Sequence, residues 1–273
     1  MALPTIGVDL GGTKALILCG ASEERSETGP DLEPATLERR LRAFASRLET
    51  PAAGIGIAVP GLVDLAGRIS ACDVLPKFAG WSPRDALADL GARVVVANDV
   101  KAALAEEMHD LAPGATAGVV MAGTAVGAAF ITEGRPLLGA SGWAGEVGYL
   151  PVLVDGGVKR LDELAGGSFM AASLGISGEE LARLAAAGDS SVLDAIRRGG
   201  FALGLGLAAV INLLNPSRLA VGGGALGLPG YWDAARDAAA RHSIPEMSHA
   251  CRLYQVRAGA RVAALGAIRL ASV

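Results

Sequence analysis

Residues 5–20 read TIGVDLGGTKALILCG: an apolar run that ends in an acid, two glycines, a threonine and a lysine, and then a second apolar run. The second run is short, which favours a buried strand over the start of a helix. Helix-based phosphate loops are excluded, because the chain lacks G-x-x-x-x-G-K-[ST] and these glycines do not open a helix. The stretch therefore predicts a strand–turn–strand hairpin.

The tip of this hairpin suits an anionic ligand such as phosphate. Gly11 and Gly12 permit positive φ and a close approach of backbone N–H groups to anionic oxygens. Thr13 adds a hydroxyl group and Lys14 a positive charge. The alternative is an ordinary hairpin whose glycines only make the turn, with Lys14 a solvated turn lysine.

Length and composition favour a two-domain protein with a small-molecule partner. At 273 residues, about two domains are expected. The net charge of −4 and the absence of a Lys/Arg-rich run disfavour nucleic acid or a membrane surface as the partner. Three scattered cysteines give neither a disulfide framework nor a thiolate metal site. Met1 runs directly into a strand pattern without a signal peptide, so we expect a cytoplasmic protein.

A mean hydropathy of +0.42 raises the question of a membrane span. Residues 111–132 carry no charge, but a proline, several glycines and a second Gly-Thr turn interrupt them, so packed strands explain them better. The apolar run at 201–214 is too short to span and holds two glycines.

Two polar residues follow a predicted strand. Residues 54–59 and 94–97 read as buried strands, and the second is followed by Asn98-Asp99 and then by helix formers at 100–107. Ligands of open α/β sheets bind outside the carboxyl ends of strands, where this pair would point. The alternative is that Asn98 or Asp99 is only a helix N-cap.

Residues 118–131 repeat the opening design of apolar run, Gly-Thr and apolar run. Placing Thr124 over Thr13 matches strand to strand and suggests a duplicated core with one phosphate-contacting hairpin in each half. Chance similarity of two Gly-Thr turns is the alternative. Farther on, Glu146 is the only acid among small and apolar neighbours, and such a carboxylate needs a partner.

The second half of the chain reads as mostly helical. One helix is predicted earlier, at 37–48, and the helices of the second half are predicted at 161–172, 178–187, 190–198, 202–214, 232–241 and 262–271. A strand at 218–221 runs into Gly222, Gly223 and Gly224, which can lie under an adenine ring or simply form a strand-to-helix turn. We expect an N-terminal α/β lobe at 1–107 and a C-terminal α/β lobe at 108–273, with a helix at about 260–273 that can pack back on the first.

Six motifs in this order resemble the ROK family of sugar kinases and repressors, over essentially the whole chain. They are Asp9-Leu10-Gly11-Gly12-Thr13-Lys14, Val59-Pro60-Gly61, Asn98-Asp99, Ala122-Gly123-Thr124, Gly145-Glu146-Val147-Gly148 and Gly222-Gly223-Gly224. The resemblance implies an α/β, two-lobed, actin-like (RNase H-like) ATPase fold with a duplicated core, and with nucleotide and sugar in an interlobe cleft.

The resemblance also implies the reaction and the residues that perform it. The reaction is ATP-dependent phosphorylation of a hexose or N-acetylhexosamine, expected at the 6-hydroxyl, with Mg²⁺ as a cofactor and Asp99 as the general base. Phosphates would be held by Gly11, Gly12, Thr13, Lys14, Gly123 and Thr124, with Asp9 near Mg²⁺ and Gly222–Gly224 at the adenosine. The sugar would contact Gly61, Asn98, Asp99 and Glu146. A homodimer is a further expectation from the family.

The chain departs from the family pattern at four positions. Tyr149 stands where the family has a zinc-binding and sugar-contacting histidine, and residues 155–167 contain no cysteine, so no structural zinc is expected. Tyr149 can still offer a hydroxyl to the sugar or can be packing. Asp162, followed by Glu163, replaces a sugar-contacting glutamate. Ala125 replaces a glycine, and its Cβ can restrict positive φ or the approach to phosphate.

Two rival functions stay open at this point. The first is a catalytically weakened sugar-binding or regulatory ROK protein; because the phosphate hairpin begins at residue 5, no DNA-binding domain is expected. The second is another actin-like ATPase, which would need neither the Asn-Asp corner nor the Gly-Glu-x-Gly segment.

Overall fold

A computed structural model describes residues 3–154 and 156–272. The chain divides into two compact units. Unit 1 comprises Met1–Asp110, Leu138–Ala144 and Arg257–Val273, and unit 2 comprises Leu111–Leu137 and Gly145–Val256. The chain therefore leaves unit 1 and returns to it twice.

Unit 1 is built on a five-stranded sheet with the order β3-β2-β1-β4-β7. Its strands are β1 (Thr5–Leu10), β2 (Lys14–Cys19), β3 (Ser22–Glu27), β4 (Gly54–Val59) and β7 (Arg93–Asn98), with a small pair β5 (Leu62–Val63) and β6 (Ile69–Ala71). Its helices are α1 (Pro34–Ala45), α2 (Pro83–Ala86), α3 (Asp99–Glu107) and α10 (Val262–Ala271). The hairpin predicted from residues 5–20 is β1–β2, with Leu10 paired to Ala15.

Unit 2 contains a second five-stranded sheet, with the order β10-β9-β8-β13-β14. Its strands are β8 (Ala117–Ala122), β9 (Val126–Thr132), β10 (Arg135–Pro136), β13 (Arg218–Gly222) and β14 (Arg252–Gln255), with a separate hairpin β11 (Pro151–Val154) and β12 (Gly157–Arg160). Its helices are α4 (Asp162–Ala165), α5 (Gly167–Ser173), α6 (Gly178–Ala186), α7 (Ser190–Leu214), α8 (Tyr231–His242) and α9 (Pro245–Ala250).

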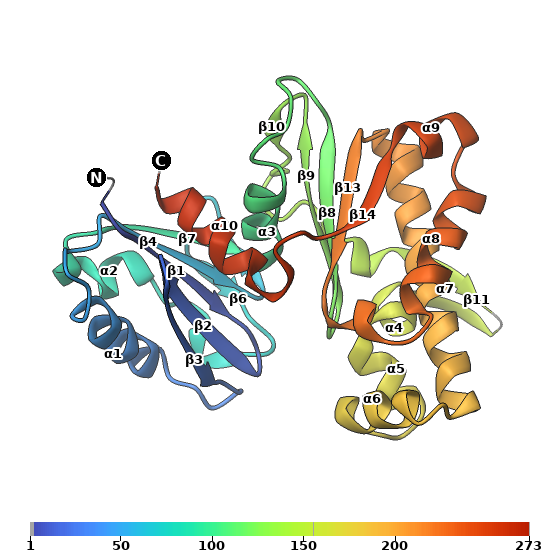
Figure 1. Ribbon diagram of the computed structural model, residues 1–273, viewed down its shortest axis with the longest axis horizontal. Coiled ribbons are helices and arrows are strands. Elements are labelled where there is room, and N and C mark those ends of the chain that lie inside the picture. Colours follow the sequence, from blue (N-terminus) through green and yellow to red (C-terminus); the bar gives the residue numbers. More distant parts are fainter. Residues whose placement is uncertain (1–2, 155, 273) are drawn as a thin grey trace. The chain divides into compact units, whose positions relative to one another are not determined.

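The two sheets have the same topology, which confirms the predicted duplication. In each, the first three strands are joined by antiparallel pairing, and the last three by parallel pairing. Thus β1 and β8 hold equivalent positions, and each is followed by a short turn and an antiparallel partner. Figure 1 shows both sheets and the elements that flank each one.

Alternation along β1 explains why unit 1 has a helix on each face of its sheet. Ile6, Val8 and Leu10 are buried and pack with the apolar stripe of α1, including Leu37 and Leu41. On the other face, Gly7 and Gly56 allow the backbone of α10 to lie directly on the sheet, and Leu16 and Leu18 of β2 pack against Ala264 of α10. A returning C-terminal helix is thus part of the core of unit 1, as Figure 1 illustrates.

The structure corrects several of the predicted elements. Residues 22–27 form the edge strand β3, which their charged sequence SEERSE did not predict. Residues 161–172 form the two short helices α4 and α5 rather than one helix. Residues 190–214 form one helix, α7, rather than two, because its glycines pack closely against neighbours such as Tyr231.

Among the described residues, α7 is the helix whose length and hydropathy would suffice to cross a membrane. Thirteen of its residues are buried within unit 2, including Leu203, Leu207 and Ile211 in the main hydrophobic cluster. Burial in the protein core accounts for its apolar composition. The uncharged segment at 111–132 forms β8 and β9, as predicted.

Candidate functional site

Three chain segments that carry predicted site residues meet at one edge of the unit 1 sheet. β1, β4 and β7 are neighbouring parallel strands, so their carboxyl ends lie side by side. The turn with Gly11 follows β1, Gly61 follows β4, and Asp99 follows β7. The sequence separates these segments by tens of residues, and the parallel pairing brings them together.

Asn98 links two of these strand ends. Its side-chain Oδ1 accepts hydrogen bonds from the amides of Val100 at 3.0 Å and Lys101 at 3.4 Å, so it is the N-cap of α3. Its Nδ2 donates to the carbonyl oxygen of Gly61 at 3.0 Å. The N-cap alternative is therefore correct for Asn98, and the same side chain also fixes a second predicted site residue.

Asp99 begins α3 at the carboxyl end of β7 and is half-buried. The amide of Val100 donates to its Oδ1 at 2.9 Å. A carboxylate at the first turn of a helix is stabilised in its ionised form by the helix dipole. This position suits a base that must be charged before it accepts a proton.

Gly61 is required by its conformation and its surroundings. Its φ of +109° is one that L side chains rarely adopt. A Cβ at this position would also collide with the carbonyl oxygen of Ala71. The backbone at the end of β4 consequently passes close to the segment after β6.

The first glycine turn is tight for a reason other than the one expected. Neither Gly11 nor Gly12 has positive φ. Instead, a Cβ on Gly11 would lie 2.9 Å from the carbonyl oxygen of Lys14, and one on Gly12 would lie 3.0 Å from Cβ of Val74. Glycine is required here because there is no room for a Cβ atom, and not because the residues have positive φ.

The hydrogen bonds of this turn leave part of its backbone available. The amide of Gly11 donates to the carbonyl oxygen of Lys14 at 2.9 Å, and Thr28 donates to the carbonyl oxygens of Gly11 and Thr13. Within the described residues, the amides of Gly12 and Thr13 make no recorded hydrogen bond, and Thr13 and Lys14 are exposed. Such amides can receive an anion.

Cys72 and Val74 are neighbours of the candidate site that carry no functional signal in the sequence. Val74 packs on Gly12, and Cα of Cys72 would lie 3.0 Å from a Cβ on Gly61. Burial is the main cause that raises the pKa of the Cys72 thiol, and the nearby charges of Asp73 and Asp99 raise it further. The segment 72–74 thus lies against both the Gly11–Lys14 turn and the Gly61 turn.

Asp9 lies on β1, one residue before the strand ends. It is half-buried, and burial raises its pKa from the ordinary 3.8 to about 6. By strand alternation it lies on the same face as Gly7, the face that α10 covers. A nearby cation would favour the ionised form of this carboxyl group.

The second glycine turn, in unit 2, places its threonine at the same distance from the following strand pair as the first turn does. Thr13 and Thr124 each stand two residues before the residue that closes the hairpin ladder, Ala15 and Val126 respectively. The turn in unit 2 is one residue shorter. Ala125, expected to restrict positive φ, does not have positive φ, and it is exposed together with Thr124.

Gly222–Gly224 lie beside this second turn, because β13 pairs with β8 and Gly222 stands opposite Met121. Gly223 has a φ of +101°, and a Cβ there would lie 2.8 Å from the amide nitrogen of Ala122. By contrast, a Cβ on Gly224 would meet nothing within 4 Å. The close approach therefore belongs to Gly223, and Gly224 begins a short 3₁₀ turn, Gly224–Gly227.

The three remaining predicted residues of unit 2 differ in exposure. Glu146 is exposed, and Tyr149 is 59% exposed, with the guanidinium group of Arg160 4.8 Å from its ring centroid. Asp162, predicted to contact a sugar, is only 6% exposed, and its Oδ1 accepts a hydrogen bond from the amide of Val126 at 2.6 Å. Burial raises the pKa of Asp162, while the Val126 bond opposes that rise. Its position disfavours direct contact with a ligand.

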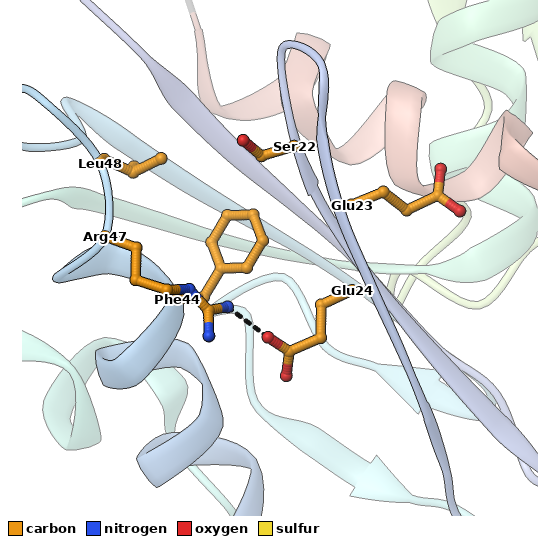
Figure 2. Close-up of a pocket in the computed structure, with 6 residues that line it drawn as sticks. All are labelled: Ser22, Glu23, Glu24, Phe44, Arg47 and Leu48. Carbon is orange, nitrogen blue, oxygen red and sulfur yellow. Dashed lines mark hydrogen bonds and ion pairs between the residues drawn. The ribbon is translucent and has the colours of Figure 1, made fainter.

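A surface pocket of about 450 Å³ lies elsewhere in unit 1, between β3 and the end of α1. Figure 2 shows the side chains that line it: Ser22, Glu23, Glu24, Phe44, Arg47 and Leu48. Arg47 forms an ion pair with Glu24 and lies 5.4 Å from the Phe44 ring centroid. Its charges are satisfied, and none of the predicted site residues lines it.

The described residues contain no group of three or more His, Cys, Asp or Glu side chains placed to hold a metal ion. Asp155, the first residue of the segment without cysteine, lies outside the described residues. Mg²⁺ bound to nucleotide phosphates needs only one or two protein carboxylates, since waters and phosphates complete its shell. The half-buried carboxyl group of Asp9 fits that requirement.

Residues 5–273 match the ROK family, and the chain belongs to this family. It is 30% identical over 257 residues to the bifunctional enzyme NanE/NanK of Brucella suis biovar 1 (strain 1330), covering 88% of this chain and 48% of that protein. It is 27% identical over 248 residues to kanosamine kinase of Amycolatopsis mediterranei (strain S699), covering 82% of each. The chain spans about half the length of the first curated relatives that it matches.

The relatives include regulators as well as kinases. A xylose repressor of Bacillus spizizenii (strain ATCC 23059 / NRRL B-14472 / W23) is 24% identical over 280 residues, covering 94% of this chain and 71% of that protein. Among solved structures, the ROK hexokinase from Thermus thermophilus superimposes with a TM-score of 0.81 at 27% identity, covering 98% of both chains. The predicted actin-like α/β fold is thereby confirmed.

Proposed function

We propose that this chain is an ATP-dependent sugar kinase that phosphorylates a hexose or N-acetylhexosamine at its 6-hydroxyl group. The supporting observation is the position of Asp99 at the carboxyl end of β7, on the same sheet edge as the Gly11–Lys14 turn. The similarity to kanosamine kinase and to the Thermus hexokinase supports the reaction class.

Asp99 is the general base of the proposed reaction. It accepts the proton of the sugar hydroxyl while that oxygen attacks the γ-phosphorus, and the bond to the bridging oxygen of the β-phosphate breaks. The products are a sugar phosphate and ADP. Phosphoryl transfer has a loose transition state, so alignment of the hydroxyl and neutralisation of charge supply most of the rate.

The glycine turns supply the phosphate contacts. In unit 1 these are the amides of Gly12 and Thr13, the Thr13 hydroxyl and the Lys14 ammonium group. In unit 2 they are Gly123 and Thr124, beside the Gly222–Gly224 segment proposed for the adenosine. Asp9 is the protein carboxylate proposed near Mg²⁺, and the bound ion would neutralise phosphate charge during transfer.

The sugar contacts proposed in unit 1 form one hydrogen-bonded set. Because Asn98 binds the Gly61 carbonyl and caps α3, it holds the Gly61 turn at a fixed distance from Asp99. Glu146 and Tyr149 are exposed residues of unit 2 that the proposal retains as sugar contacts.

An ADP-release assay tests the proposal. The substrates are glucose, mannose, fructose, N-acetylglucosamine, N-acetylmannosamine, allose and kanosamine. We expect turnover on at least one sugar, and a loss of about 100-fold or more in kcat for Asp99→Asn, since an amide cannot accept the proton. Asp85→Asn, an exposed acid on α2, is the matched control and should keep wild-type activity.

Two observations keep a regulatory alternative in view: a xylose repressor is among the relatives, and Ala125 replaces a glycine in the second turn. It predicts sugar binding without ADP release. Calorimetric titration with the same sugars separates the two: saturable binding with no turnover on any sugar supports the regulator and contradicts the kinase.

A further inference from the structure

Asp162 is a buried acid whose contacts lead to the second glycine turn. It begins α4, and its Oδ1 receives the amide of Val126, the first residue after the turn, at 2.6 Å. Gly148 packs against the carboxyl group, because a Cβ at Gly148 would lie 2.6 Å from Cγ of Asp162. The carboxylate therefore has little freedom to move toward solvent.

The segment that follows Asp162 holds the other end of the same turn. At the start of α5, the amide of Gly167 donates to the carbonyl oxygen of Gly123 at 2.7 Å, and the amide of Ser168 donates to that of Thr124 at 3.4 Å. Residues 166 and 167 must be small, since a Cβ on Gly166 would lie 2.7 Å from the Thr124 carbonyl oxygen.

These three hydrogen bonds orient the turn. Two of its carbonyl groups are directed at α5, and the Val126 amide is directed at Asp162. The amides of Thr124 and Ala125 make no recorded hydrogen bond within the described part of the chain, and both residues are exposed. An anion can approach these amides only if the turn keeps this orientation.

We propose that Asp162 is a positioning residue for the phosphate-contacting turn at Gly123–Thr124, and not a sugar ligand. The proposal rests on the proposed function of that turn in nucleotide binding. Ala125 stands where the family pattern has a glycine, and the hydrogen bond to Asp162 fixes the next residue, Val126.

The test separates nucleotide binding from sugar binding. Affinity for Mg²⁺–ADP is measured by calorimetry, and KM for ATP and for the best sugar by steady-state kinetics. Asp162→Ala removes the acceptor and should weaken ADP binding and raise the KM for ATP by about fivefold or more, with the sugar KM unchanged. Asp162→Asn keeps an oxygen acceptor but loses the negative charge, and should weaken ADP binding less, by about two- to fivefold. Glu163→Gln, the exposed neighbour, is the matched control.

The outcomes are distinct. A raised sugar KM with unchanged ADP affinity would overturn the positioning role and make Asp162 a sugar ligand. Should Asp162→Ala fail to fold, Asp162→Asn decides: a two- to fivefold loss of ADP affinity at constant sugar KM supports the proposal. If no sugar is phosphorylated, the kinase assignment fails while the ADP titration still decides the role of Asp162. No ADP binding by the wild-type protein would overturn the proposal.

Discussion

The half-buried carboxyl group of Asp9 can bind a cation, but its charge lowers the stability of the folded protein at neutral pH. Burial at the end of β1 raises its pKa to about 6, so the folded protein takes up a proton at Asp9 at a pH where the unfolded chain, with a pKa near 3.8, has released it. This group therefore favours folding most below pH 3.8, and that contribution is lost as the pH rises through 6. At neutral pH its charge costs stability that a bound cation would recover.

We predict that Asp9→Asn raises the free energy of unfolding at pH 7.5 by about 2 kcal/mol, from a pKa shift of roughly two units. The gain should shrink as the pH falls from 6 to 4, because the wild-type carboxyl group is then protonated. Thermal unfolding at several pH values measures it, with the fully exposed Asp31→Asn as control. A gain independent of pH would contradict the proposed cause.

Several residue-level features were predictable from sequence, and others were not. The strand-to-helix corner at Asn98-Asp99 follows from local pattern, but the bond from Asn98 to Gly61 depends on parallel pairing of β4 and β7 and has no local signal. The family resemblance predicted a sugar contact for Asp162, but its burial against Gly148 is a tertiary contact that local sequence does not reveal. Neither Cys72 nor Val74 carries any signal that could have assigned it to the site.

At the scale of elements, α10 is the helix on which the sheet of unit 1 depends. Its sequence was predicted to be helical, but the fit of its backbone to the sheet depends on glycines in β1 and β4. A Cβ on Gly56 would collide with the carbonyl oxygen of Ala267, and one on Gly7 with that of Ala264. The backbone of α10 therefore packs directly against the backbone of β1 and β4.

We expect Gly56→Ala to destabilise unit 1 by about 3 kcal/mol or more, because two backbones must move apart to admit the methyl group. Gly29→Ala is the matched control, since its Cβ would meet nothing within 4 Å and its φ is not positive. Urea unfolding followed by circular dichroism compares the two. Equal midpoints for both variants would show that α10 does not pack so closely.

Strands with a clear run of apolar residues were predicted well from sequence. Strands at the edges of the sheets were predicted poorly. The strands β1, β4, β7 and β8 each contain an apolar run that needs no tertiary information, although in β7 only Val94 is buried. β3 and β12 are mostly polar edge or surface strands, and their pairing is fixed by a neighbouring strand rather than by their own residues.

At the scale of the whole molecule, one ion pair lies where the chain changes unit. Glu107 is 0% exposed and receives hydrogen bonds from the Arg257 amide at 2.6 Å and from its Nε at 3.2 Å. Asp110, 3.5 Å from Arg257 Nη1, is the last residue of unit 1 before the first crossing, and Arg257 is the first after the last crossing. The pair joins an outgoing and a returning segment within unit 1.

We predict that Arg257→Met destabilises the protein by about 2 kcal/mol, less than the roughly 3–5 kcal/mol typical of fully buried pairs, because Arg257 is 47% exposed. Adding Glu107→Gln should recover part of the loss, since the buried charge is then removed. Urea unfolding of the single and double variants gives the coupling energy. Arg183→Met, which breaks a surface pair, should cost at most about 0.5 kcal/mol; strict additivity at 107 and 257 would contradict the prediction.

The discontinuity of unit 1 has a consequence for the order of events during translation. A ribosome makes residues 111–256 before it makes α10, so every part of unit 2 has been synthesised while the sheet of unit 1 still lacks the helix for one of its faces. The glycine-lined face of β1 and β4 lacks this helix until residues 257–273 are synthesised. The strands of unit 1 are therefore synthesised before unit 2, and the core of unit 1 is completed after it.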